Sequence, residues 1–278
     1  MTERNLTTIR RWPIITTRDG MVLYVPPSDQ FSLNSIPAVV DPFLTPTTQE
    51  FPLGTKLVYG DRVFRYCRLG AVAQTAGKLM QAVVPLAGRI AEAIDAPAIG
   101  ATVIAFTPAV APTDDLALDE LADGYIGIDD DTGAGHLYRI KSHPAIAGAV
   151  SGNLTLYDPI VIAPAAASTA SVMHNKYRNL IIHPSPATAK LIGVLPTDFA
   201  ANDYGWVQTG GPAKVLTEGT IVINEIVVDS ASADGAVAPM ALTEGAPNTD
   251  AGQHKVGVAL QVNATTTYSI IELMLEMA

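Results

Sequence analysis

The stretch Phe51-Pro-Leu-Gly-Thr-Lys-Leu-Val-Tyr-Gly-Asp-Arg-Val-Phe-Arg-Tyr66 decides the fold class. Two runs rich in Val, Tyr and Phe flank Gly60-Asp61, and such a dipeptide between β-forming runs is typical of a hairpin turn. In the second run, Val63 and Arg65 alternate with residues that face the other way, which is the period of two found in strands. The stretch therefore predicts a β-hairpin.

Beyond residue 123 the chain repeats this signal many times. Short β-branched or aromatic runs are separated by Gly, Pro, Asn and Asp, the residues that turns use. Strands at such close spacing are typical of a barrel or a sandwich. We therefore expect a mainly β protein whose C-terminal module, residues 123–278, is a β-barrel or β-sandwich. The runs are Gly124–Ile128, His136–Lys141, Asn153–Ile162, Tyr177–His183, Ala189–Leu195, Tyr204–Thr209, Thr220–Val228, Lys255–Val262 and Thr267–Met277.

Residues 51–122 combine the hairpin with an Ala-rich segment. Ala87–Ile94 has the spacing of an amphipathic helix, whereas Lys78–Val84 and Ala101–Phe106 have the composition of strands. We interpret residues 51–122 as a small hairpin-plus-helix region.

Residues 1–50 contain six prolines and no sustained periodicity apart from a strand-like Met21–Val25. Proline fixes φ and removes a backbone donor, so this segment should be extended rather than helical. We expect an extended N-terminal arm that becomes ordered on another surface. The alternative is a terminus packed on its own domain.

Composition limits the possible functions. Hydrophobic residues make up 48% of the chain and charged residues only 16%, which excludes a disordered chain and predicts largely neutral contact surfaces. The net charge of −10 disfavours nucleic-acid binding. This charge is uneven, because residues 1–89 hold ten Lys and Arg against six Asp and Glu, and the rest hold seven against twenty-one. The asymmetry either guides assembly or is an ordinary solvated surface. Neither a signal peptide nor a membrane span is expected.

No pattern predicts a catalytic or cofactor site. The segment from Gly70 to Lys78 resembles a phosphate-binding loop, but its glycine spacing is wrong and Leu79 stands where a magnesium-binding Ser or Thr belongs. The one cysteine, Cys67, excludes an intramolecular disulfide, and the five histidines are scattered. Asp129-Asp130-Asp131 either holds a calcium ion or forms a solvated turn. We expect a protein that is not an enzyme and uses no cofactor.

Two segments resemble structural proteins of tailed bacteriophages. Residues 52–82 contain Leu-Gly-Thr, Phe-Arg-Tyr, Gly-Ala and Ala-Gly-Lys-Leu in the order found in head decoration proteins, which stabilise capsids. Tyr204–Leu216, followed by Lys255–Leu260 and a closing strand, is similar to the C-terminal β-module of the same group. Compact decoration proteins are shorter, and the N-terminal arm and Pro85–Leu121 have no counterpart in them.

The resemblance implies a phage virion protein that binds and reinforces the capsid as a decoration or cement protein. Its partners would be the major capsid protein and copies of itself in a trimer or another closed oligomer, with no nucleic acid and no membrane. It would be made in the cytoplasm of the bacterial host and lie on the capsid exterior. The alternatives are another virion component, namely a tail, neck, head-fibre or shell protein, or a glycan- or receptor-binding module.

Candidate interface residues lie on two of the predicted strands. Arg62, Arg65 and Arg68 could meet an acidic capsid or the acidic part of a neighbouring copy, although strand parity places Arg65 on the opposite face from Arg62. Tyr204 and Trp206 share one strand face. These two aromatic residues are either interface anchors or core residues.

Overall fold

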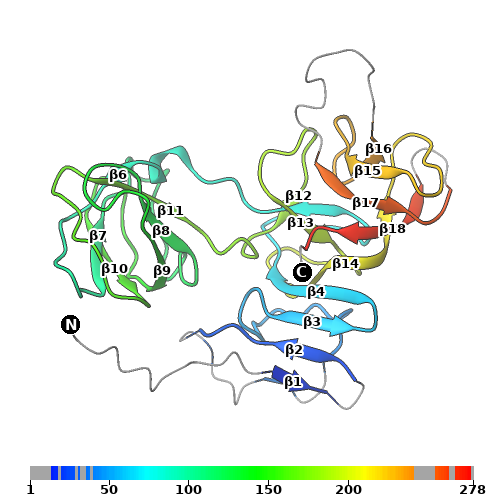
Figure 1. Ribbon diagram of the computed structural model, residues 1–278, viewed down its shortest axis with the longest axis horizontal. Coiled ribbons are helices and arrows are strands. Elements are labelled where there is room, and N and C mark those ends of the chain that lie inside the picture. The colour runs from blue at the N-terminus through cyan, green and yellow to red at the C-terminus, as the bar shows by residue number, and fades with distance from the viewer. Residues whose placement is uncertain are drawn as a thin grey trace. The chain divides into compact units, whose positions relative to one another are not determined.

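The computed structural model describes residues 14–17, 20–28, 31, 36–37, 40–240, 254–262 and 267–276. These residues form antiparallel β-sheets, and the single helical element among them is a 3-10 turn, η2 (Ala87–Arg89). The prediction of a mainly β protein is therefore confirmed. The chain divides into two compact units (Figure 1). Unit 1 comprises Met1–Gln81, Ile181–Ala187 and Leu191–Ala278, and unit 2 comprises Ala82–Leu180 and Thr188–Lys190.

These units differ from the expected division at residues 50 and 122. Unit 2 is an insertion within unit 1, so the predicted module 123–278 contains strands of both units. The reason is a long-range pairing: β5 (Leu79–Gln81) precedes the insertion and is hydrogen-bonded to β13 (Leu191–Val194), which follows it. The sheet of unit 1 is therefore assembled from both sides of the insertion.

Unit 1 contains one sheet of twelve strands in the order β1-β2-β3-β4-β14-β18-β17-β15-β16, with β13, β5 and β12 attached through β14. Besides β5 and β13, its strands are β1 (Ile14–Thr16), β2 (Val22–Tyr24), β3 (Lys56–Tyr59), β4 (Arg62–Arg68), β12 (Ile181–Ile182), β14 (Tyr204–Leu216), β15 (Ile226–Asp229), β16 (Val237–Pro239), β17 (Lys255–Ala259) and β18 (Tyr268–Met274). The predicted hairpin around Gly60-Asp61 is present as β3 and β4.

Strand β14 connects the two halves of this sheet. Its first half pairs with β4 and its second half, from Gly210 onward, pairs with β18. The register shifts between Gln208 and Gly210, and Gly211 has a φ of 77°. A Cβ at Gly211 would overlap the carbonyl oxygen of Asp61, so only glycine fits this bend.

The second half of the sheet curls into a half-barrel. A parallel bridge joins Thr217, just after β14, to Val237 of β16, and the N–H of Leu79 donates to the carbonyl of Gly235 at 2.8 Å. Apolar side chains from these strands fill the interior, and each one that is fully buried contributes about 1.5–3 kcal/mol to folding. They include Leu79, Val215, Val227, Val237, Ile271 and Leu273.

The prediction of an extended N-terminal arm is wrong for the described part of residues 1–50. Strand β1 pairs with β2, and β2 pairs with β3, which places this segment within the sheet of unit 1. Leu23 and Val25 have no exposed surface, because they are part of the core. The alternative of a terminus packed on its own domain describes these strands, whereas residues 1–13 lie outside the described residues.

Unit 2 is a six-stranded antiparallel sheet in the order β6-β11-β8-β9-β10-β7. A bridge between Ile94 and Phe106 joins its two ends, supported by the N–H of Thr107, which donates to the carbonyl of Ala93 at 3.0 Å. The sheet therefore closes on itself and leaves no free edge there. Its strands are β6 (Glu92–Ala93), β7 (Val103–Phe106), β8 (Tyr125–Ile128), β9 (Leu137–Ser142), β10 (Gly152–Leu156) and β11 (Thr169–Met173).

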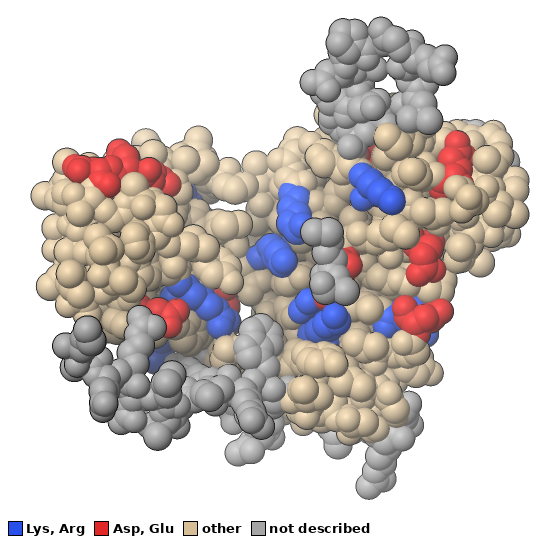
Figure 2. Space-filling view, in the orientation of Figure 1, with Lys and Arg blue, Asp and Glu red and all other residues tan. Residues whose placement is uncertain are grey.

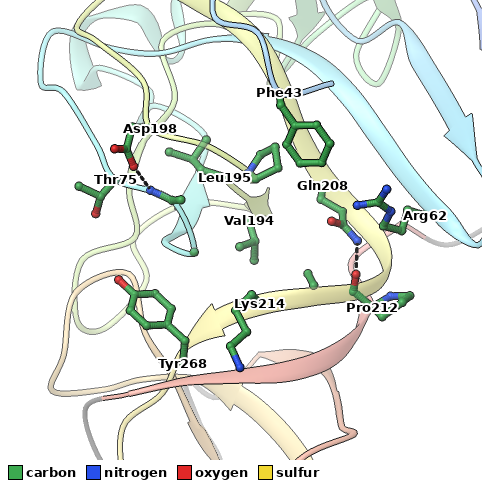
Figure 3. A pocket seen from close by; sticks show the side chains of 14 residues that line it. Phe43, Arg62, Thr75, Val194, Leu195, Asp198, Gln208, Pro212, Lys214 and Tyr268 are labelled. Carbon is green, nitrogen blue, oxygen red and sulfur yellow. Dashed lines mark hydrogen bonds between the residues drawn. The ribbon is translucent and has the colours of Figure 1, made fainter. Parts of the chain in front are cut away.

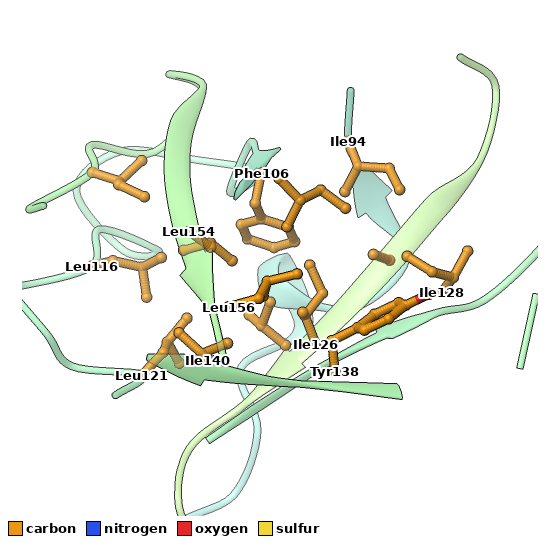
Figure 4. Packing of buried hydrophobic residues seen from close by; sticks show 14 of the residues in the cluster. Ile94, Phe106, Leu116, Leu121, Ile126, Ile128, Tyr138, Ile140, Leu154 and Leu156 are labelled. Atoms are coloured by element: carbon orange, nitrogen blue, oxygen red, sulfur yellow. The ribbon is translucent and has the colours of Figure 1, made fainter. Parts of the chain in front are cut away.

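Alternate side chains of these strands point inward and form the core shown in Figure 4, which includes Phe106, Ile126, Tyr138, Ile140 and Leu154. The predicted helix Ala87–Ile94 is wrong: only Ala87–Arg89 is helical, as a 3-10 turn, and Glu92–Ala93 is strand β6. The pairing of β6 with β11 and the bridge at Ile94 outweigh the weak helical spacing of the segment.

Candidate interaction surfaces

Trp206 belongs to the core of unit 1. Strand register places it opposite Tyr66, and only 2% of its surface is exposed. The centre of its ring lies 5.1 Å from the ring centres of both Phe51 and Tyr66. Such close tilted contacts between buried rings stabilise the core beyond the area that they bury. Of the two interpretations, the core one describes Trp206 in this structure, because its indole is almost fully buried within unit 1.

Tyr204 and Arg68 lie together where β14 begins and β4 ends. They are directly opposed in register, and the guanidinium of Arg68 lies 5.8 Å from the centre of the Tyr204 ring. Arg68 also donates to the side chain of Asn202 at 3.1 Å. Both residues are half-buried, so they leave a small polar and aromatic corner accessible.

Arg65 is occupied within its own unit. Its Nε donates to Glu276 Oε2 at 3.1 Å, its Nη2 donates to Glu276 Oε1, and its Nη1 donates to the carbonyl of Gly54 at 2.9 Å. Its guanidinium therefore has an internal role, and the interface role of Arg65 stays a prediction.

Arg62 differs from the other two arginines. Its guanidinium carbon lies 5.3, 5.5 and 5.7 Å from the ring centres of Tyr59, Phe64 and Phe43. Among the described residues, no hydrogen bond or ion pair to Arg62 is found. The three rings lie around the guanidinium at cation–π distance, and its N–H groups have no acceptor among the described residues.

Arg62 lines a cleft of about 450 Å³ in unit 1 (Figure 3). Arg62 and Gln208 lie near Phe43 at one end, and Asp198 and Tyr268 lie at the other. This volume is in the range of small-ligand sites, which bind through a few polar groups on mostly apolar walls. Sequence reasoning missed the cleft because its lining comes from segments that are far apart in the chain.

The polar groups of the cleft are mostly donors. Gln208 Nε2 donates to the carbonyls of Gly210 and Pro212 at 3.1 and 2.9 Å, which fixes its orientation. Asp198 is the one carboxylate among the described lining residues, and its Oδ1 accepts the N–H of Ala76 at 2.8 Å. Lys214, which also lines the cleft, donates to Gln261 at 3.2 Å. Two cations thus stand against one carboxylate.

A second surface is apolar and lies on the outside of unit 2. Tyr125 of β8 pairs with Met173 of β11, and Leu137 of β9 pairs with Gly127. With Ile90 they line a shallow groove of about 280 Å³. Leu137 is 63% exposed, Ile90 48% and Met173 46%. The sequence carries a signal for this groove. Its large apolar residues alternate along their strands with residues such as Ile126 and Tyr138, which face the interior, so they must face outward.

Comparisons with known proteins identify no relative of this chain. No protein-family model, curated protein or solved structure matches the chain.

The acidic run of unit 2 has separate partners for each side chain. Asp129 accepts the hydroxyl of Ser171 at 2.6 Å, Asp130 accepts the N–H of Thr169 at 2.6 Å, and Asp131 accepts the N–H of Thr132 at 2.9 Å. Within the described ranges no three His, Cys, Asp or Glu side chains gather as metal ligands would. In the same ranges no helix has the length and apolar character needed to cross a bilayer.

Glu120 is part of an internal hydrogen-bond network in unit 2. Glu120 Oε1 accepts from Arg89 Nη1 at 2.7 Å and lies 2.8 Å from His174 Nε2. Burial by itself raises the pKa of Glu120, but hydrogen bonds from His174, from the N–H of Ala117 and from Arg89 lower it to about 2. The network therefore holds a carboxylate in its charged form beside a buried arginine.

Two further reactive side chains, Cys67 and His143, are also buried. Burial raises the pKa of the Cys67 thiol, so the nucleophilic thiolate is disfavoured. Burial lowers the pKa of His143, whose Nε2 accepts the N–H of Leu121 at 2.9 Å. Both side chains are therefore part of the packed interior and are not accessible to a substrate.

Proposed function

We propose that this chain is a structural protein of a tailed-phage virion that attaches to the outside of the head as a decoration protein. The observation that carries the proposal is the exposed apolar groove of unit 2, formed by Ile90, Tyr125, Leu137 and Met173. Exposed hydrophobic side chains that converge on one surface are typical of protein–protein contacts. The motif resemblance of residues 52–82, 204–216 and 255–260 to head decoration proteins supports the assignment to a head.

The mechanism is multivalent attachment. Each copy covers the groove of unit 2 against the major capsid protein, and copies joined in a trimer or another closed oligomer bind with a high effective concentration. Individually weak contacts then add up across the capsid surface. Unit 1 remains free to contact neighbouring copies.

The location test is immunogold electron microscopy of purified particles of the phage that encodes the chain. We expect label on the head exterior at many positions per particle. Label confined to the tail or neck, or particles without label, would contradict the proposal and favour the other virion roles or a receptor-binding module.

The contact test uses Leu137→Glu, which places a charge over Gly127 in the centre of the groove. Leu118→Glu is the matched control, because Leu118 is 68% exposed in the same unit but does not line the groove. We expect Leu137→Glu to lose at least about tenfold in affinity for heads that lack the protein, and Leu118→Glu to bind as the wild type does. Equal binding by both variants would exclude the groove as the attachment surface.

A further inference from the structure

The guanidinium of Arg62 is positioned by aromatic rings but has no acceptor among the residues that the structure describes. The rings of Phe43, Tyr59 and Phe64 restrict where it lies, and no described residue accepts its N–H groups. A pre-oriented guanidinium presents a fork of donors that matches the two oxygens of a carboxylate. Because the rings already limit its rotamers, binding there costs less side-chain entropy than at a free surface arginine.

The surroundings of Arg62 favour an anion. Lys214 adds a second cation to the lining, whereas Asp198, the one acid among the described lining residues, already has an oxygen engaged by the N–H of Ala76. The Gln208 amide donates to two backbone carbonyls, so it is fixed in place. The cleft therefore suits a carboxylate that enters beside Arg62.

The same chain carries carboxylates on an exposed loop. Asp129, Asp130 and Asp131 lie between β8 and β9 of unit 2, and all three are exposed. Each uses one oxygen in an internal hydrogen bond, which leaves its second oxygen for a partner. Figure 2 shows Asp and Glu side chains gathered at one end of unit 2, whereas the visible face of unit 1 carries both Lys and Arg and Asp and Glu side chains.

The uneven distribution of charge between residues 1–89 and the rest of the chain does not explain why the acidic loop and the cleft are complementary. Unit 1 holds eleven Lys and Arg against sixteen Asp and Glu, and unit 2 holds six against eleven, so each unit carries −5. Two copies with equal net charge repel at long range. Attraction between them must come from local pairs, such as an exposed acidic loop and a cleft with free donors.

We propose that the Arg62 cleft of unit 1 receives the Asp129–Asp131 loop of a second copy of this chain. The contact is heterologous, because it joins different surfaces on the two copies. Repeated contacts of this kind build a ring if the rotation from each copy to the next returns to the first copy. This inference deepens the proposed function and rests on it for the need to self-associate. It names the contact between copies, which is separate from the apolar groove assigned to the capsid.

The test is sedimentation velocity of the full chain over a range of concentrations at low salt. Arg62→Gln removes the charge while keeping a side chain that fits near the rings. Replacement of Asp129, Asp130 and Asp131 by Asn removes the loop charges but keeps the oxygens that accept from Ser171, Thr169 and Thr132. Each variant should weaken self-association at least about tenfold, and salt near 300 mM should weaken that of the wild type.

Two matched controls should associate as the wild type does. Arg68→Gln changes a half-buried arginine of the same strand that does not line the cleft, and Asp158→Asn changes an exposed acid of unit 2 outside the loop. Circular dichroism of each variant at the same concentration checks that it is folded. If an Arg62→Gln chain is unfolded, Lys214→Gln, at the exposed lining cation, takes its place.

The decisive experiment mixes the two variants. An Arg62→Gln chain keeps an intact acidic loop and the triple Asn chain keeps an intact cleft, so the mixture can form one contact and should stop at a 1:1 dimer. A wild type that stays monomeric at low salt, or an Arg62→Gln chain that associates as the wild type does, would overturn the proposal. Head attachment is measured separately with Leu137→Glu. Failure of the contact between copies can therefore be distinguished from failure of the contact with the capsid.

Discussion

Arg65 and Glu276 form a two-point ion pair in unit 1, although they are 211 positions apart in the sequence. The same carboxylate accepts the hydroxyl of Thr209 at 2.7 Å and lies 3.3 Å from Lys56 Nζ. Both side chains of the pair are mostly buried, with exposed fractions of 21% for Arg65 and 12% for Glu276. The contacts of Glu276 therefore join the segment that follows β18 to β3, β4 and β14.

Glu276→Gln should lower the free energy of unfolding of unit 1 by about 1–3 kcal/mol, because it leaves the charge of Arg65 partly buried without its counter-charge. Urea titration followed by tryptophan fluorescence measures the change. Glu272→Gln, four residues earlier in β18, is the control, since no ion pair to Glu272 is found among the described residues. Equal losses in the two variants would show that the pair has no special role.

The stability that Glu276 provides should depend on pH. Burial by itself raises the pKa of Glu276, but hydrogen bonds from Arg65 and Thr209 and the charges of Arg65 and Lys56 lower it. Stability from a carboxylate with a lowered folded-state pKa is complete above the unfolded pKa of about 4.3, and it is lost as the pH falls through the folded-state value. The deficit of Glu276→Gln should therefore be largest near neutral pH and shrink in acid. A stability deficit of Glu276→Gln that is the same in acid as at neutral pH would contradict this prediction.

The strands that sequence predicts are those with a local signal. The hairpin at Gly60-Asp61 and the strands around Tyr125 and Leu137 are rich in β-branched or aromatic residues, and each forms. Strand β11 was missed, because Thr169–Met173 follows an alanine-rich stretch that has little β propensity. It is a strand because β8 pairs with it and because Ala170 and Val172 face the interior of unit 2.

The candidate site depends on contacts that a single sequence does not encode locally. Parity along β4 correctly separates Arg65 from Arg62, but it cannot show that Glu276 binds the first of them. In the same way, only the register between β4 and β14 places Trp206 opposite Tyr66. Local pattern therefore predicts which face a side chain occupies, and long-range pairing decides whether that face is buried.

Leu23→Ala tests whether the N-terminal strands belong to unit 1. Leu23 is opposite Leu57 in β3, and neither has exposed surface. The substitution should therefore cost about 2–5 kcal/mol in free energy of unfolding. Ile14→Ala, at a position that is 63% exposed in β1, should cost much less. If both variants unfold at the wild-type urea concentration, the segment acts as a free arm.

Trp206→Ala tests the distinction between core and interface. Loss of the contacts with Phe51 and Tyr66 should lower the free energy of unfolding by about 3–5 kcal/mol. Tyr204→Ala, on the same strand face but half-buried, is expected to be milder because its ring stacks on Tyr66 from the first position of β14 and is partly exposed. A Trp206→Ala chain of normal stability that fails to self-associate would restore the interface interpretation.

The closed sheet of unit 2 predicts that a fragment of residues 82–190 folds without the rest of the chain. The bridge between Ile94 and Phe106 completes the ring of strands, and the core is supplied entirely from within the unit, so excision leaves no strand edge of this sheet unpaired. The fragment should unfold cooperatively in urea. Phe106→Ala should remove about 3–5 kcal/mol from it, because Phe106 is fully buried at the closure, whereas Val103→Ala on the outside should have little effect. A fragment that shows no cooperative transition would mean that closure of the sheet is not sufficient and that unit 1 is required to hold it.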